Sequence, residues 1–144
     1  MHLCVQPRAL LRIDQDSSAK WLRPALMTSV SDVLDRPWIL DIDATIKTVF
    51  GHQVGATLGY NQHKPGRSGH ALHTYWVGNL RLVLDVQVSP GNELSSKHAK
   101  TGLGALLDEL EPSRRPKLVR GDSGYGNEGI LLTLESREQP YLTV

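Results

Sequence analysis

The chain has very little cysteine and no long apolar run among its 144 residues. Its single cysteine, Cys4, excludes an internal disulfide and any zinc site built from several cysteines, and it fits a reducing cytoplasm. No apolar stretch approaches the roughly 20 residues of a membrane-spanning helix, so no membrane partner is expected. The first eleven residues lack the continuous apolar core of a signal peptide. These absences predict a cytoplasmic globular protein that is long enough for one domain.

Acidic residues are missing from one long window of the sequence. No Asp or Glu occurs from Ala44 to Leu84, although the formal net charge of the whole chain is only +1. The window does contain four basic residues, which are Lys47, Lys64, Arg67 and Arg81. Two interpretations stay open at this point: a solvated, slightly basic hairpin, or a surface that faces phosphate groups beside an acidic metal site.

Two predicted core strands carry carboxylates where a core strand should have none. Ile39 to Thr45 alternates apolar residues with Asp41 and Asp43, and the strand from Leu118 ends on Asp122. Burying a lone charge costs several kcal/mol unless a partner or a metal offsets the cost. Two strand-borne aspartates far apart in the sequence are typical of a divalent-metal site for phosphoryl transfer, because Mg²⁺ prefers rigidly held oxygen ligands.

Residues 1–37 form a poorly defined N-terminal segment, with a helical piece expected over 19–33 and broken by Pro24. From Trp38 the pattern predicts the order β-β-β-α-β-α-β, a mixed α/β sheet with helices packed on it. The loop 51–69 precedes two strands, 70–77 and 81–88, that meet at a tight turn around Gly78 and Asn79. A helix then begins at Ser95 or Ser96, and a second one is capped by Asn127.

This order places the two aspartates together. A right-handed helical crossover would make the strand at Trp38 and the strand at Lys117 parallel neighbours. Asp43 and Asp122 would then lie near the carboxyl ends of both strands, where open α/β sheets hold ligands. Asp41 points to the same face as Asp43, because strand side chains alternate with period two, so either could be the first ligand. Asp43 is preferred since it lies closer to the strand end and can pair with Thr45.

Three segments resemble one known family. They are LDIDATIKTVFGHQ, GYNQHKPGRSGHALHTYWVGNLRLVLDVQVSPGN and LVRGDSGYGNEG, and they follow one another in the order found in the catalytic domain of DDE transposases from bacterial insertion sequences. The resemblance covers 38–144 and implies a ribonuclease H-like fold. It also implies Mg²⁺, with Mn²⁺ as a possible substitute, and DNA cleavage and strand transfer on insertion-sequence ends and target DNA in a bacterial cytoplasm. Asp43 would be the first catalytic, metal-binding residue and Asp122 the second.

The third carboxylate that the resemblance implies has no match in this chain. In the family a Glu follows on a helix beyond the strand after the second Asp, and Glu128 and Glu135 come too early for that place. The expectation is therefore a partial catalytic domain, incomplete at the C-terminus, inactive as this fragment and prone to self-association. Two other functions stay open: a non-catalytic nucleic-acid-binding remnant, and a small metal nuclease with Glu93 or Glu128 as the third ligand.

The loop before the hairpin is predicted to contact DNA. Lys64 and Arg67, together with Arg81 in the hairpin, would offset phosphate charge. A zinc site at His63, His70 and His73 is the weaker interpretation of this region, because residues three apart on a strand point to opposite faces.

Overall fold

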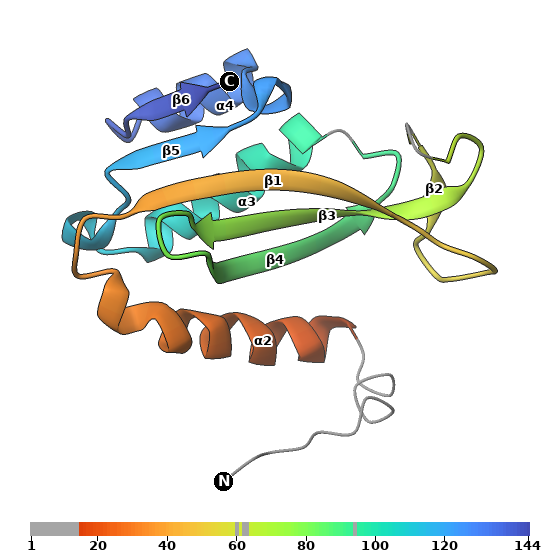
Figure 1. Ribbon diagram of the computed structural model, residues 1–144, viewed down its shortest axis with the longest axis horizontal. Helices are drawn as coiled ribbons and strands as arrows, with labels where there is room; N and C mark the ends of the chain where they lie inside the picture. The colour runs from red at the N-terminus through yellow and green to blue at the C-terminus, as the bar shows by residue number, and fades with distance from the viewer. Residues whose placement is uncertain (1–14, 60, 62–63, 94) are drawn as a thin grey trace, which may run out of the picture.

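The computed structural model describes residues 15–59, 61, 64–93 and 95–144. An N-terminal helix, α2 (Gln15–Val30), leads through the short helix η1 (Ser31–Val33) into the sheet (Figure 1). The sheet segments and the helices between them are β1 (Ile39–Thr48), β2 (Thr57–Leu58), β3 (Ser68–Val77), β4 (Leu82–Pro90), α3 (Ser95–Glu109), η2 (Pro112–Arg114), β5 (Leu118–Gly121), η3 (Ser123–Tyr125), α4 (Glu128–Glu135) and β6 (Tyr141–Thr143). The predicted order is confirmed, with the two-residue β2 added inside the predicted loop.

The six strands form one mixed sheet. The order is β2-β3-β1-β5-β6, and β4 also pairs with β3. β3 is antiparallel to both of its long neighbours, β1 and β4, whereas β1, β5 and β6 are parallel, as the crossovers through α3 and α4 require. β1 and β5 therefore both end at the same side of the sheet, where the segment around β2 also lies (Figure 1).

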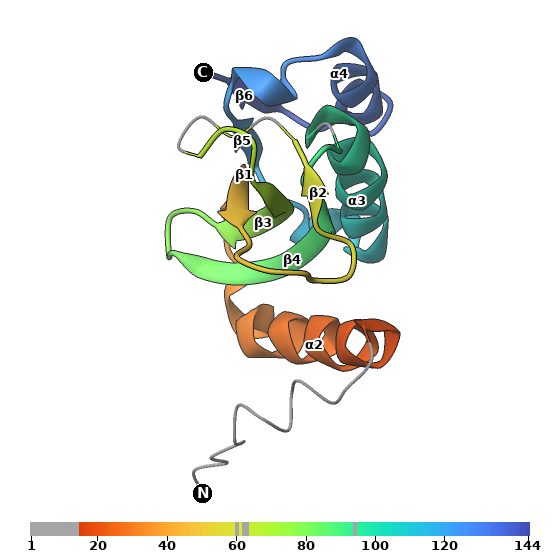
Figure 2. The ribbon, with the colours of Figure 1, turned by 90° about the vertical axis from the view of Figure 1, so that its right-hand side faces the viewer.

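Helices α3 and α4 lie together against one face of this sheet, and α2 runs beside the β4 edge (Figure 2). In the part of the chain that the structure describes, no helix covers the opposite face (Figure 2). The strands carry this difference in their side chains: Leu40 and Ile42 of β1 are buried toward α3, whereas Asp41 is only half-buried and Asp43 is exposed. None of the described helices is both long and apolar enough to cross a lipid bilayer.

The core lies between α3 and the sheet. Leu103, Leu106, Leu107 and Leu110 recur at helical spacing and are all buried, as the periodicity predicted. They pack with residues of β1, β3, β4 and β5 and with Ile130 and Leu134 of α4. Trp38, also buried, donates a hydrogen bond from Nε1 to the Arg114 carbonyl at 2.9 Å, so its one polar atom is satisfied.

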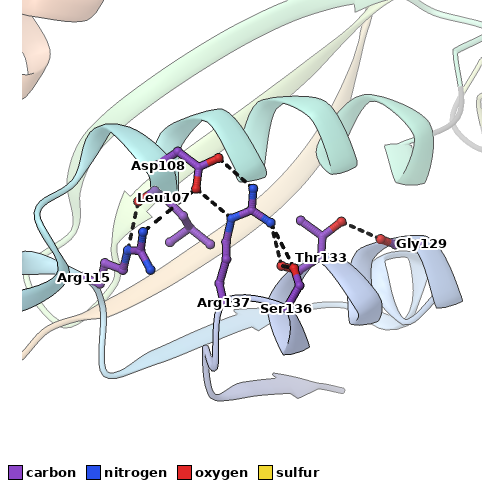
Figure 3. Close-up of polar contacts among 7 residues, drawn as sticks. All are labelled: Leu107, Asp108, Arg115, Gly129, Thr133, Ser136 and Arg137. Carbon is purple, nitrogen blue, oxygen red and sulfur yellow. Dashed lines mark hydrogen bonds and ion pairs between the residues drawn. The ribbon is translucent and has the colours of Figure 1, made fainter.

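An arginine joins α3 to α4 (Figure 3). Arg137 donates from Nε and Nη2 to the two carboxylate oxygens of Asp108 at 2.9 and 2.7 Å, and from Nη1 to the Thr133 carbonyl at 2.9 Å. The hydrogen bond from Arg137 holds the pKa of Asp108 below its usual value. At the other end of α4, Asn127 begins the helix by accepting from the Ile130 amide at 3.2 Å, as predicted.

Two local predictions need correction. Helix α2 continues through Pro24 without a break, since a helix can accommodate the ring with the loss of one hydrogen bond. The hairpin turn is longer than a two-residue turn, because Val77 pairs with Leu82 and the turn spans 78–81. Arg81 has a φ of 55°, a left-handed conformation that closes this turn.

The β3–β4 hairpin also contains a bulge. Tyr75 pairs with Asp85 and Trp76 with Val83, so the register shifts by one residue at Leu84. Leu84 and Asp85 are consequently both buried, although neighbours on a regular strand point to opposite faces. Asp85 accepts a hydrogen bond from Gln87 Nε2 at 2.8 Å, and its carboxylate lies 3.8 Å from Arg23 of α2.

The first prediction concerns the core. Leu107→Ala should lower the free energy of unfolding by about 2–5 kcal/mol, because it leaves a cavity under α3 that the neighbouring side chains fill only in part. Leu132→Ala, on the exposed side of α4, should change it by less than about 1 kcal/mol and is the matched control. Urea denaturation followed by circular dichroism measures both, and equal losses would contradict the position of the core.

Candidate functional site

The two predicted aspartates lie on neighbouring parallel strands. β1 pairs with β5 from Ile39–Leu118 to Ile42–Gly121, so the next position in register is Asp43 beside Asp122. Asp122 directly follows β5 and keeps an extended backbone, with φ −73° and ψ 175°. Asp41 and Arg120 form a pair on the open face. Asp43 follows Asp41 by two residues and Asp122 follows Arg120 by two residues. Since side chains alternate along extended backbone, Asp43 and Asp122 belong to the same face. The prediction that these strands are parallel neighbours is confirmed.

Each carboxylate is oriented by one local hydrogen bond. Thr45 Oγ1 donates to Asp43 Oδ2 at 3.0 Å, and the Gly124 amide donates to Asp122 Oδ1 at 2.9 Å. The second bond makes Asp122 the N-cap of η3. Among the described residues, none donates a hydrogen bond to the other oxygen of either carboxylate. Both side chains are exposed, so these oxygens face solvent at the carboxyl ends of the strands.

The third aspartate on this face, Asp41, is already paired. Arg120 donates from Nε and Nη2 to the two oxygens of Asp41 at 2.8 and 2.7 Å, in a bidentate pair that spans β1 and β5. This contact also raises the pKa of Arg120. A Cβ atom on Gly78 would displace the Asp41 carboxylate, so the glycine leaves room for this pair where the hairpin passes it. The geometry therefore separates Asp41, which holds two strands together, from Asp43.

Gly121 explains how β5 approaches β1 so closely beside Asp122. A Cβ at this position would lie 2.9 Å from Cγ1 of Ile42 and 3.2 Å from the side chain of Tyr125. Tyr125 is only 2% exposed and packs against the Gly121 backbone. Burial raises the pKa of Tyr125, and the charges of Tyr75, Asp43 and Asp122 raise it further.

Lys64 and Arg67 lie together beyond the end of β1. Their cationic groups lie 4.7 and 5.8 Å from the ring centroid of Phe50, which is 67% exposed. Arg81 is not part of this group. It closes the β3–β4 turn at the other end of β1, where the Gly78 amide donates to the Ile39 carbonyl at 2.8 Å.

No group of three His, Cys, Asp or Glu side chains suited to a metal ion occurs in the described residues. Within that part of the chain, Glu93 and Glu128 do not complete a metal site with Asp43 and Asp122. His73 is buried, with Nε2 3.1 Å from Ser89 Oγ, and His70 is half-buried on the opposite face, as the alternation predicted. His63 lies outside the described residues.

Three residues of this region were not predicted from the sequence. Arg120 precedes Asp122 by two positions, just as Asp41 precedes Asp43. Because strand side chains alternate with period two, the sequence contained the signal that places Arg120 opposite Asp41. Tyr125 gave a weaker signal as an aromatic residue in the turn after β5. Phe50 gave none, because its position beside Lys64 and Arg67 depends on a long-range contact of the loop.

We expect Gly121→Ala to disturb the site through packing. The added methyl group meets Ile42 and Tyr125, so the variant should lose about 1–3 kcal/mol of unfolding free energy. Gly129→Ala in the first turn of α4 is the control, because its Cβ would make only ordinary contacts of 3.5 Å or more. That variant should be neutral or slightly more stable. Thermal unfolding of both variants gives the comparison, and an unchanged Gly121→Ala would refute the close approach.

One solved structure with a TM-score above 0.5 shares this arrangement of strands and helices. The Mos1 transposase in a paired-end complex with the left transposon end matches with a TM-score of 0.51 and 11% identity, over 90% of this chain and 43% of that one. The piggyBac transposase in a synaptic complex with hairpin DNA gives a TM-score of 0.49 and 16% identity, over 94% of this chain and 31% of that one. The chain thus spans less than half of either structure. The Mos1 likeness shows a ribonuclease H-like fold, as expected.

The sequence itself matches one family model. That model describes the transposase DDE domain and covers residues 35–143, which include the whole sheet and both aspartates. No curated protein matches the chain. Since the model matches most of the chain, the chain belongs to the family of the transposase DDE domain.

Proposed function

We propose that this chain is the part of a DNA transposase that carries the first two catalytic carboxylates. The observation that supports this most directly is the register of β1 and β5, which brings Asp43 beside Asp122 on the open face of the sheet. Family membership supports DNA cleavage and strand transfer as the reaction class. The DNA partners are the insertion-sequence ends and the target DNA.

The donor set at Asp43 and Asp122 fits Mg²⁺ or Mn²⁺. Both groups are carboxylates, both are exposed, and each has an oxygen facing solvent after its local hydrogen bond. Hard divalent cations take such oxygen ligands and keep several water molecules or substrate phosphate oxygens. A bound metal ion would supply charge stabilisation and an activated oxygen nucleophile. Asp43 and Asp122 would position it, and the Arg120 pair with Asp41 would keep their strands in register.

Metal binding should depend on two of the three aspartates. Asp43→Asn and Asp122→Asn should each weaken Mn²⁺ binding at least about tenfold, because a charged ligand is lost while its shape is kept. Asp41→Asn should weaken binding less, since Arg120 already occupies that carboxylate. Calorimetric titration of the 144-residue chain with MnCl₂ measures the three affinities.

Asp32→Asn, on the exposed helix η1 away from the site, controls for general charge loss. A larger effect of Asp41→Asn than of Asp43→Asn would reassign the first ligand. If Asp43→Asn and Asp122→Asn both bound Mn²⁺ as the unaltered chain does, the proposed site would be wrong.

DNA binding should be electrostatic and independent of sequence. The basic groups of Lys64, Arg67 and Arg81 lie in a window without carboxylates, so affinity for unrelated duplexes should fall steeply as salt rises. Replacing Lys64 and Arg67 by Ala should lower affinity more than Arg81→Ala, because only the first two lie together. Fluorescence anisotropy at two salt concentrations tests this, and salt-insensitive affinity would rule out the basic surface as the DNA contact.

Self-association through the open face also belongs to this proposal. Val88 and Leu142 are each 46% exposed. Trp76 and Leu72 of β3 are half-buried on the face of the sheet to which the aspartates belong. An apolar sheet face of this kind favours contact with another protein surface. A transposase that joins two DNA ends needs such contacts between copies.

A further inference from the structure

The one phenylalanine of the chain is held in the open beside two cations. Phe50 follows β1 by two residues and is 67% exposed, although an aromatic side chain gains most from burial. The Lys64 ammonium group lies 4.7 Å and the Arg67 guanidinium group 5.8 Å from its ring centroid. An exposed ring flanked by positive charges is the combination that binds a base together with its phosphate.

This group is built into the fold by the residues around it. Asn61, only 7% exposed, donates from Nδ2 to Thr48 Oγ1 at 2.8 Å and accepts from the Lys64 amide at 3.0 Å. The Val49 amide donates to the Ser68 carbonyl at 2.9 Å, which ties the other side of the loop to β1. Gly66, with a φ of 75°, allows the turn that brings Arg67 back toward the ring. The backbone on both sides of the Phe50 group is therefore tied to the end of β1.

We propose that Phe50 stacks on an unpaired base of DNA, with Lys64 and Arg67 holding the adjacent phosphates. An unpaired base is the partner because the π-face of a base inside a duplex is already covered by its neighbours. No carboxylate between Ala44 and Leu84 opposes a phosphate at this position. The inference rests on the DNA binding proposed above and adds a second contact to it.

Phe50 lies just beyond the end of β1, the strand that also carries Asp43. β1 runs from Asp43 to its end at Thr48 toward the loop that bears Phe50 (Figure 1). Five strand residues span roughly 17 Å, which corresponds to about five nucleotide steps along one DNA strand. The unpaired base would thus lie several nucleotides from a phosphate at Asp43 and Asp122.

The test compares two DNA duplexes of the same sequence, one fully paired and one with a single unpaired base. The 144-residue chain should bind the second more tightly. Phe50→Leu should weaken binding to the unpaired-base duplex about tenfold and leave the paired duplex nearly unchanged, because stacking is lost while the charges remain. Phe50→Trp should keep the preference. Val54→Ala, in the same loop and fully exposed, is the control and should change neither affinity.

The outcomes separate this inference from the broader one. If Phe50→Leu binds both duplexes as the unaltered chain does, stacking is refuted while DNA binding stands. An equal loss on both duplexes refutes the unpaired base as the partner and assigns the ring to paired DNA. A chain that binds neither duplex at low salt refutes DNA binding and this inference together. Circular dichroism melting of each variant checks that the fold is kept.

Discussion

The parallel pairing of β1 with β5 is the constraint on which the rest of the site depends. The two strands are about eighty residues apart in the sequence, so only the crossover through α3 can bring them together in this direction. Two features then fix their register at the site: the bidentate contact of Arg120 with Asp41, and the close approach that Gly121 allows to Ile42. A slip of one residue would turn Asp43 away from Asp122.

The division of β1 into two faces explains how the strand tolerates two aspartates. Leu40 and Ile42 contribute to the core, whereas Asp41 and Asp43 face the side that no described helix covers. Water or a paired cation can reach each carboxylate there, so the cost of burying an ion is avoided. The same openness leaves half-buried apolar residues such as Trp76 beside the carboxylates. Exposed carboxylates and half-buried apolar side chains are thus two consequences of one face that no described helix covers.

The sequence predicted those parts of the fold that depend on periodicity and handedness. Alternation in β1, helical spacing in α3 and the Asn127 cap are local signals, and the right-handed crossover converts them into the parallel pairing of β1 with β5. It did not predict the pairing of Arg120 with Asp41, the bulge at Leu84, or the separation of Arg81 from Lys64 and Arg67. These features depend on loop length and on long-range contacts, such as the bond from Asn61 to Thr48, that no local pattern encodes.

The charges around the site give a physical reason for a divalent cation. Asp41, Asp43 and Asp122 carry three negative charges, and Arg120, which contacts Asp41, carries one positive charge, so this group has a formal charge of −2. Lys47, on the same face of β1, lies roughly 13 Å beyond Asp43 along the strand and is too far to neutralise it in solvent. Two neighbouring carboxylates fixed by strand register repel each other, and their repulsion is relieved most by a small ion of charge +2 placed between them. Because Arg120 balances the charge of Asp41, the formal charge of −2 remains on Asp43 and Asp122. One divalent ion can balance that charge.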